Sequence, residues 1–279
     1  MTSLTILTPS LNNEAYLRQA IASVLSQELH GDLELIVIDG QSRDGTLSML
    51  KSVGDPRLKW ISEPDQGQAA AINKGLNMAR GDVVTWLNCD DLYEPGALAT
   101  VADSFEKDPD LQWLIGRCDI IDGGGRVIRQ TITNYKNHLL DTFSLKSLLR
   151  MNMISQPAVF WRRDFGRSVG PLDERLHWTM DYDLWLRMAR RCPPLILDKK
   201  LARFRVHEQS KSRGGHAPQF REGYRVARRY FGNDRASHLA HVLNVEKIVW
   251  GYRALRFMES SHDFPSRPHV AAVGGAVVK

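Results

Sequence analysis

Carboxylates follow several apolar runs of this chain and are the residues best suited to chemistry. Asp39 closes one run, Asp65 follows the next, Asp90 and Asp91 follow a third, and Asp181 opens a motif far downstream. Acids just beyond the carboxyl ends of parallel strands meet in one crevice. Such a crevice repels phosphates unless a divalent cation lies between them. The pattern therefore predicts a metal-assisted enzyme acting on a nucleotide-activated substrate, with one carboxylate left over as a base.

The elements that position these acids are predicted from hydrophobic spacing. Strands are expected at 4–8, 33–39, 58–62 and 83–87, alternating with helices after Asn12 and Asn13 and at 46–53 and 66–79. The two asparagines are expected to cap the first helix, and Gly81 is expected to end the third. This alternation implies right-handed βαβ units and a parallel sheet.

The second half is less regular. A hairpin is expected between 113–121 and 126–133, with further strands at 156–161 and 195–205. Residues 181–191 read as an amphipathic helix with Leu184, Trp185 and Met188 inward, and 239–255 as a longer one.

The charge of the chain is unevenly distributed. The net charge is +5, but residues 203–258 hold 12 Lys and Arg against 4 Asp and Glu, an excess of +8 that leaves −3 elsewhere. Two interpretations stay open, a solvated helix face or a surface for an anionic partner such as a membrane or a phosphorylated lipid.

Composition narrows the class of protein. The chain is 43% hydrophobic and 25% charged over 279 residues, as in soluble globular proteins. The first residues contain no basic region or cleavage site of a signal peptide, so a cytoplasmic location is expected. The chain has three cysteines and no C-x-x-C pair, so neither a disulfide framework nor a zinc site is expected.

Five ordered motifs together resemble glycosyltransferase family 2. They are Thr8–Leu17, Ile38–Thr46, Asp65–Gly67, Leu87–Asp91 and Asp181–Arg187. The resemblance covers roughly residues 3–210. It implies the GT-A fold, an α/β architecture with a Rossmann-like, mostly parallel sheet flanked by helices, here with a C-terminal helical extension. It also implies inverting transfer of a sugar from a nucleotide-sugar donor.

The resemblance assigns roles to individual residues. It places Pro9, Ser10, Glu14, Asp39 and Asp65 around the nucleotide. The family's D-x-D element, which binds ribose and Mg²⁺ or Mn²⁺, reads Asn-Cys-Asp here. Asn88 can still bond a ribose hydroxyl but adds no charge, so Asp90 becomes the main metal ligand.

The remaining roles concern the reaction itself. Asp181 matches the general base, although the acid that precedes it in the family is Met180 here. Asp183, two residues on, is expected to be structural. His207 could hold the metal or a phosphate. The residues with a possible contact to substrate or diphosphate are Asp91, Gln156, Arg205 and Arg213.

The function expected is transfer of a hexose, with UDP as the carrier, to a hydroxyl of a saccharide or lipid-linked saccharide. Surface polysaccharide, O-antigen or capsule assembly at the inner face of a membrane would fit. The expected parts are a GT-A domain at 1–212 (nucleotide half about 1–115, acceptor half about 116–212), a basic helical extension at 213–263 and a flexible tail at 264–279.

The alternatives to this function are a nucleotidyltransferase, a dinucleotide oxidoreductase and a non-enzymatic binding protein. A nucleotidyltransferase usually needs a glycine-rich phosphate loop near its N-terminus, and Thr8–Glu14 contains no glycine. A dinucleotide oxidoreductase needs G-x-G-x-x-G after the first strand, which is absent. A non-enzymatic protein that binds anionic lipid or nucleic acid through its basic tail remains as the third, although no nucleic-acid partner is expected.

Overall fold

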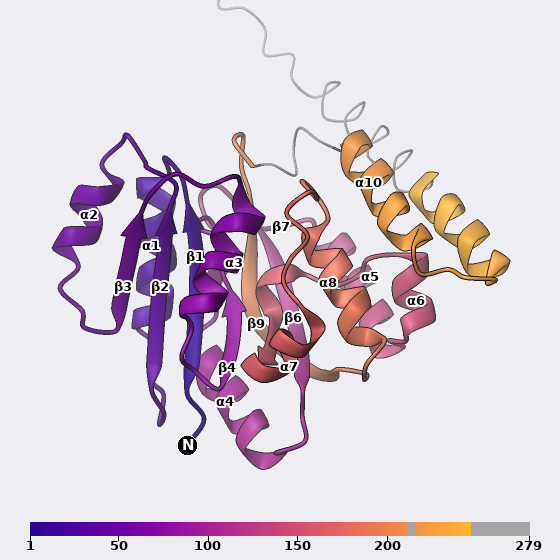
Figure 1. Ribbon diagram of the computed structural model, residues 1–279, viewed down its shortest axis with the longest axis horizontal. Helices are drawn as coiled ribbons and strands as arrows, with labels where there is room; N and C mark the ends of the chain where they lie inside the picture. Colours follow the sequence, from indigo (N-terminus) through magenta and orange to yellow (C-terminus); the bar gives the residue numbers. More distant parts are fainter. Residues whose placement is uncertain (211–215, 247–279) are drawn as a thin grey trace, which may run out of the picture.

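The computed structural model describes residues 1–210 and 216–246. Within these residues the strands form one nine-stranded sheet of order β3-β2-β1-β4-β8-β6-β9-β5, with β7 paired to β6 (Figure 1). The strands are β1 (Leu4–Ser10), β2 (Leu33–Asp39), β3 (Leu58–Ser62), β4 (Val83–Trp86), β5 (Leu92–Tyr93), β6 (Trp113–Asp122), β7 (Val127–Ile128), β8 (Val159–Arg162) and β9 (Leu195–Val206).

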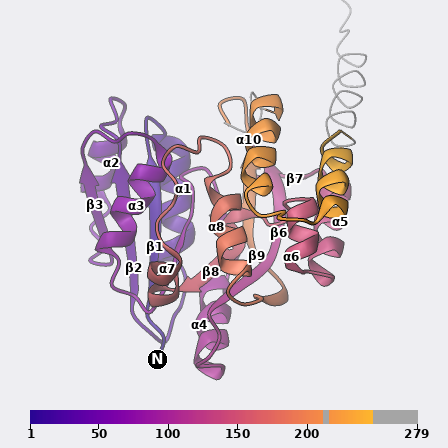
Figure 2. The same cartoon turned by 45° about the vertical axis from the view of Figure 1, so that its right-hand side comes forward.

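Helices cover both faces of this sheet (Figures 1 and 2). The helices are α1 (Glu14–Leu25), α2 (Thr46–Ser52), α3 (Gln68–Met78), α4 (Ala97–Lys107), α5 (Gln130–Asp141), α6 (Leu145–Arg150), α7 (Arg163–Val169), α8 (Met180–Ala189) and α10 (His216–Arg228), with a 3-10 turn η1 (Gln156–Ala158). A further helix occupies residues 235–246. The predicted α/β sheet flanked by helices is confirmed.

The parallel half of the sheet follows the prediction closely. β1 pairs in parallel with β2 and β4, and β2 pairs in parallel with β3. Ser10 lies opposite Asp39 in this register, so these two strands end at the same edge. The second half is mixed, because β8 runs antiparallel to both β4 and β6 while β9 runs parallel to β6 and antiparallel to β5.

Two apolar clusters lie on opposite faces of the sheet. Leu4 and Ile6 of β1 belong to the cluster that includes α1 and α4. Leu7, the next residue, belongs to the cluster with α3 and α8. Alternate residues of a strand point to opposite faces, so one strand supplies both layers. Each fully buried aliphatic side chain contributes about 1.5–3 kcal/mol.

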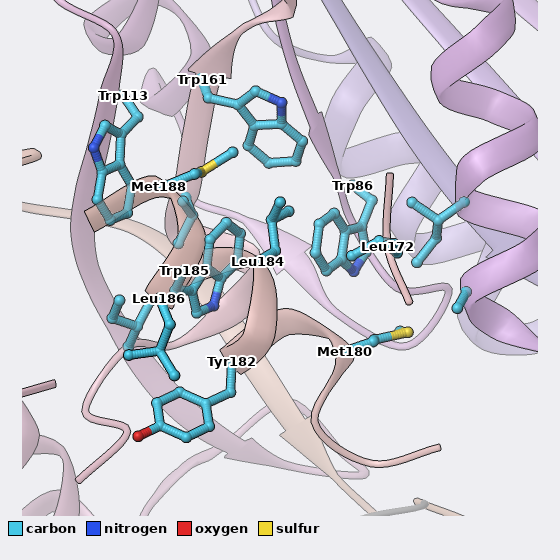
Figure 3. Packing of buried hydrophobic residues seen from close by; sticks show 14 of the residues in the cluster. Trp86, Trp113, Trp161, Leu172, Met180, Tyr182, Leu184, Trp185, Leu186 and Met188 are labelled. Carbon is cyan, nitrogen blue, oxygen red and sulfur yellow. The ribbon is translucent and has the colours of Figure 1, made fainter. Parts of the chain in front are cut away.

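Four tryptophans connect the sheet to α8 (Figure 3). The Trp185 indole stacks on Trp86 with ring centroids 5.6 Å apart and on Trp113 at 6.3 Å, while Trp161 meets Trp86 edge-on at 5.6 Å. Trp185 is completely buried, as expected for the inward face of its helix. This stack fixes α8 against the strands β4, β6 and β8.

The predicted helix caps are wrong. Asn13 makes no side-chain capping bond to α1; its amide donates to Cys89 Sγ at 3.3 Å, and Asn12 Oδ1 accepts from the Arg43 amide at 2.7 Å. α3 ends at Met78 without a glycine cap. Gly81 is needed for another reason, because a Cβ there would lie 2.6 Å from the β1 backbone.

The hairpin expected between 113–121 and 126–133 is present, because β7 pairs antiparallel with β6, but its second strand is much shorter than expected. Only Val127 and Ile128 form a strand, and α5 starts at Gln130 after Arg129 adopts a left-handed φ of 54°. The apolar residues at 127, 128 and 132 suggested a strand, whereas the longer segment packs as a helix against β6.

The helix expected from residue 239 is present as far as 246, the last residue described in this segment. Its apolar residues Leu239 and Val242 are 62% and 38% exposed, so within 235–246 they do not pack into the core. Ser237 and His241 are buried instead, and His241 Nδ1 lies 2.8 Å from the Leu149 carbonyl oxygen. The part of this predicted helix beyond 246, and the predicted tail at 264–279, lie outside the described residues.

Candidate active site

A cavity of about 420 Å³ opens where β1 and β4 end, and both halves of the chain line it. The predicted residues in its wall are Pro9, Ser10, Asp65, Asn88, Asp90, Gln156, Asp181 and Arg205. The convergence expected from their positions after strands is therefore present. Arg213 lies outside the described residues.

Asp90 and His207 form the pair best suited to a cation. His207 Nε2 lies 3.1 Å from Asp90 Oδ2, although the two residues are 117 positions apart. The Asp90 side chain is 22% exposed and the His207 side chain 9%. Tyr16 from α1 packs against the imidazole with ring centroids 4.6 Å apart. The imidazole is thus fixed beside a carboxylate that reaches the cavity.

No group of three or more His, Cys, Asp or Glu side chains arranged to hold a metal occurs among residues 1–210 and 216–246. Two protein ligands still fit Mg²⁺ or Mn²⁺, since such ions are often held by one or two carboxylates together with substrate phosphates. Asp90 and His207 would hold the ion on the protein side. The site is therefore suited to a metal that arrives with a diphosphate.

Asn88 is the centre of a hydrogen-bond network. Its Oδ1 accepts from Gln68 Nε2 at 2.7 Å, and its Nδ2 donates to Asp91 Oδ2 and to Gln156 Oε1, each at 3.0 Å. Gln156 in turn donates to the Trp86 carbonyl at 2.7 Å. An amide can donate and accept at once, whereas a carboxylate in this place would face two acceptors. The network accounts for asparagine where the family has an acid.

Asp91 lies beneath this network and does not line the cavity. It is fully buried, and its carboxylate accepts from the Arg205 amide at 2.9 Å and from Asn88. Burial and then the neighbouring Asp90 carboxylate raise the pKa of Asp91 well above its ordinary value. Its possible contact with substrate is not supported by this position.

Arg205 holds the loop that contains Asp90 and Asp91. Its Nε donates to the Asp90 carbonyl at 2.7 Å, and its two terminal nitrogens donate to the Gly123 carbonyl and to Gln19 Oε1, each at 2.9 Å. The residue is 1% exposed. Because protein acceptors already occupy the guanidinium, it is placed to support Asp90 rather than to reach a diphosphate.

The expected nucleotide ligands differ in their access to the cavity. Asp65 lines it, with Oδ1 accepting from the Gly67 amide at 2.9 Å. Asp39 is fully buried and accepts from Ser42 and Ser62. Glu14 pairs with Arg18 outside the cavity. Of these three, only Asp65 is placed for direct contact without rearrangement.

Asp181, in the first turn of α8, also lines the cavity. Tyr182 donates its backbone N–H to Asp181 Oδ1 at 2.8 Å. The wall also includes His177, Trp178 and, from α10, Gln219. These three residues were not predicted, although the two aromatic rings directly before the acidic motif were a signal that could have indicated them. Asp183 is buried in an ion pair with Arg187, as expected for a structural residue.

Cys89 lies in the cavity wall, where its surroundings disfavour the thiolate. Burial raises the pKa of Cys89 to about 12, so the thiol stays protonated near neutral pH.

Comparison with known proteins gives the class. A family model described as "Glycosyl transferase family 2" matches residues 5–165, and the chain belongs to that family. An uncharacterized glycosyltransferase of Rickettsia conorii is 29% identical over 218 residues, which is 76% of this chain and 35% of that protein. A PGL/p-HBAD biosynthesis glycosyltransferase of Mycobacterium bovis is 33% identical over 188 residues, covering 65% and 68%. The chain thus spans about a third of the length of the rickettsial relative.

Solved structures show the same fold. S. aureus TarS 1-349 in complex with UDP-GlcNAc superposes with a TM-score of 0.65 at 17% identity, covering 80% of this chain and 65% of that one. The mannosyltransferase PcManGT from Pyrobaculum calidifontis, in complex with GDP-Man and Mn²⁺, gives 0.60 at 16% identity, covering 91% and 80%. The GT-A fold predicted from the motifs is confirmed. No helix in the described part of the chain has the length and apolarity needed to cross a bilayer.

Proposed function

We propose that this family 2 protein is an inverting glycosyltransferase that moves a hexose from a UDP-sugar to a hydroxyl group. The observation that carries the proposal is that one cavity is lined both by Asp90, which pairs with His207, and by Asp181 in the first turn of α8. A cation ligand and a separate carboxylate are the two groups that the reaction needs. Ser10 lines the same cavity, and its Oγ is buried without a hydrogen-bond partner in the described residues.

Each bond that forms and breaks in the proposed transfer can be assigned to the donor, the acceptor and the residues of this site. The Asp181 carboxylate takes the proton of the acceptor hydroxyl while the oxygen of that hydroxyl forms a bond to the anomeric carbon of the donor sugar. The bond from that carbon to the diphosphate breaks on the opposite face, so the configuration inverts and the nucleoside diphosphate leaves. A bound Mg²⁺ or Mn²⁺ would neutralise charge on the departing diphosphate. Asp90 and His207 would hold that ion, and Arg205 keeps the Asp90 backbone in place.

The nucleotide is tested first by calorimetry with UDP, GDP, dTDP and CDP, each with and without Mn²⁺. Binding of UDP that requires Mn²⁺ supports the proposal. The complexes of related folds with UDP-GlcNAc and with GDP-Man make UDP and GDP the two leading choices. Absence of metal-dependent binding for all four nucleotides would contradict the proposal and favour a protein that acts through its basic C-terminal segment.

For the acceptor we propose a saccharide or lipid-linked saccharide at a membrane surface, as in surface polysaccharide, O-antigen or capsule assembly. The helix at 235–246 exposes Leu239, Val242 and Leu243 on its outer face. The neighbouring α10 exposes three arginines, Arg221, Arg225 and Arg228. Apolar side chains beside cations are the pattern of helices that lie in an anionic lipid surface.

Vesicle flotation tests this peripheral location. The wild-type protein should float with phosphatidylglycerol vesicles and not with phosphatidylcholine vesicles. Leu239→Ser with Leu243→Ser should reduce flotation several-fold, whereas Val127→Ser, which changes an exposed apolar residue on β7, should not. Equal flotation of the double variant and the wild type would exclude this surface.

A further inference from the structure

The carboxylate of Glu222 on α10 holds the segment that leads into the Asp181 helix. Its Oε1 accepts from the His177 amide at 3.0 Å. Its Oε2 accepts from the Trp178 amide at 2.6 Å and from the Thr179 amide at 2.9 Å. The Thr179 hydroxyl donates to the same oxygen at 3.0 Å. One side chain thus fixes three consecutive backbone N–H groups, 43 to 45 positions away in the sequence.

This segment is part of the cavity wall. His177 and Trp178 line the cavity with Asp181, and Thr179 is the residue before the first turn of α8. The first N–H groups of a helix have no partner within the helix. Glu222 supplies an acceptor for the N–H groups of residues 177–179, which lead into α8. The backbone that leads into the turn of Asp181 is therefore held by a contact from outside α8.

The same helix also reaches the cavity directly. Gln219 lies one turn before Glu222 on α10 and lines the cavity beside His177 and Trp178. α10 packs against α8. Glu222 itself is 5% exposed. Burial raises the pKa of Glu222, but the hydrogen bonds from the backbone of 177–179 outweigh it and leave the pKa below its ordinary value.

We infer that α10 completes the acceptor side of the active site, with Glu222 as a positioning residue for Asp181 and Gln219 as a contact for a hydroxyl-bearing, saccharide-like acceptor. The inference rests on the proposed function. It goes beyond the family match, which ends at residue 165. It also moves the limit of the functional unit past 212, the boundary expected from the sequence, because the contacts of Glu222 span that boundary.

The test compares Glu222→Gln with Glu34→Gln. Glu34 is a matched control, since it is also a mostly buried glutamate that accepts a backbone N–H bond, from Arg80, but it starts β2 far from the cavity. The full chain is assayed for release of UDP from UDP-glucose, UDP-galactose and UDP-GlcNAc with Mn²⁺. Hydrogen exchange of the amides 177–183 is followed in the same proteins.

The expected result is a split between the kinetic parameters. Glu222→Gln should lower kcat at least tenfold while the KM for the donor stays within twofold, because Glu222 contacts the segment that leads to Asp181, whereas the proposed donor ligands Asp65 and Asp90 belong to other segments. Exchange at 177–183 should become faster in this variant alone, and Glu222→Asp should recover part of kcat. Glu34→Gln should keep the wild-type kcat.

Two results would overturn the inference. One is a wild-type kcat in Glu222→Gln despite faster exchange at 177–183. The other is an equal loss in Glu34→Gln, which would show general destabilisation. A wild-type protein that neither binds UDP with Mn²⁺ nor releases it from any donor would instead contradict the proposed function, so the two failures are distinguishable.

Discussion

The Asp90 carboxylate and the His207 imidazole lie 3.1 Å apart, Oδ2 to Nε2, at the end of β9. The two residues are 117 positions apart in the sequence. Strand β9 brings them together, because it pairs with both β5 and β6. A carboxylate and an imidazole at this separation can share one cation. The pair is the part of the site most directly open to test.

Removal of either member should weaken metal-dependent nucleotide binding. We expect Asp90→Ala and His207→Ala each to raise the Kd of UDP with Mn²⁺ by about 10–100-fold, on the scale seen when a metal site loses an interaction. Binding measured without metal should change little. Calorimetry checks both values, with Asp103→Ala on the exposed side of α4 as the control. An unchanged Kd in both variants would place the cation elsewhere.

Asp181 should be required for turnover but not for donor binding. Asp181→Asn keeps the shape and the bond from the Tyr182 amide but cannot accept a proton, so we expect kcat to fall by about 10²–10⁴-fold. The Kd of UDP with Mn²⁺ should stay within threefold. Asp164→Asn, an exposed position on α7, serves as the control. Wild-type turnover in Asp181→Asn would show that the base is another residue.

The amide of Asn88 should be needed for stability. Asn88→Asp directs a carboxylate at Asp91 Oδ2 and Gln156 Oε1, and we expect a loss of about 1–3 kcal/mol in the free energy of unfolding at pH 8. Adding Asp91→Asn restores a donor between the two side chains and should recover part of that loss. Urea unfolding of the two single variants and the double variant measures the coupling; strictly additive losses would refute it.

Glu222 should make stability depend on pH in a defined direction. Its pKa is lowered in the folded state from an ordinary value of 4.5, so its contribution is present above that pH and is lost as pH falls through the folded pKa. The Tm difference between wild type and Glu222→Gln should therefore be constant from pH 7 to pH 5 and shrink below pH 4.5. Scanning calorimetry measures it, and a difference that grows on acidification would contradict this assignment.

The sequence predicted the parallel half of the fold well because its signals are local. The β-branched run at 33–39 can only be a buried strand, and an acid after each such run must lie at the same sheet edge. Asp65 and Asp90 were found in this way, and both line the cavity. Asp181 was assigned from the family resemblance and lies in the first turn of α8. The second half gave weaker local signals, and the first residues of α5 were placed in the strand expected at 126–133.

The residues that the sequence did not reveal act over long separations. Glu222 and Gln219 lie on a helix whose arginines suggested only a charged surface. Arg205 was read as a diphosphate ligand from its charge, whereas its burial turns it into a support for Asp90. No periodicity predicts which polar side chain a distant backbone will need. Such contacts require the tertiary structure.

The position of β9 also determines the order in which the molecule can be completed. Among the strands of residues 1–210 and 216–246, β9 is the last to be synthesised, yet it lies between β6 and β5 and carries Arg205, which bonds to Asp90 and Asp91. During synthesis Asp91 emerges 114 residues before Arg205. Until β9 inserts, the Asp91 carboxylate lacks the hydrogen bond that the Arg205 amide donates to it. A nascent chain can thus form its first βαβ units before the loop that contains Asp90 and Asp91 has all of its hydrogen-bond partners. The pair of Asp90 and His207 is therefore complete only when β9 has entered the sheet.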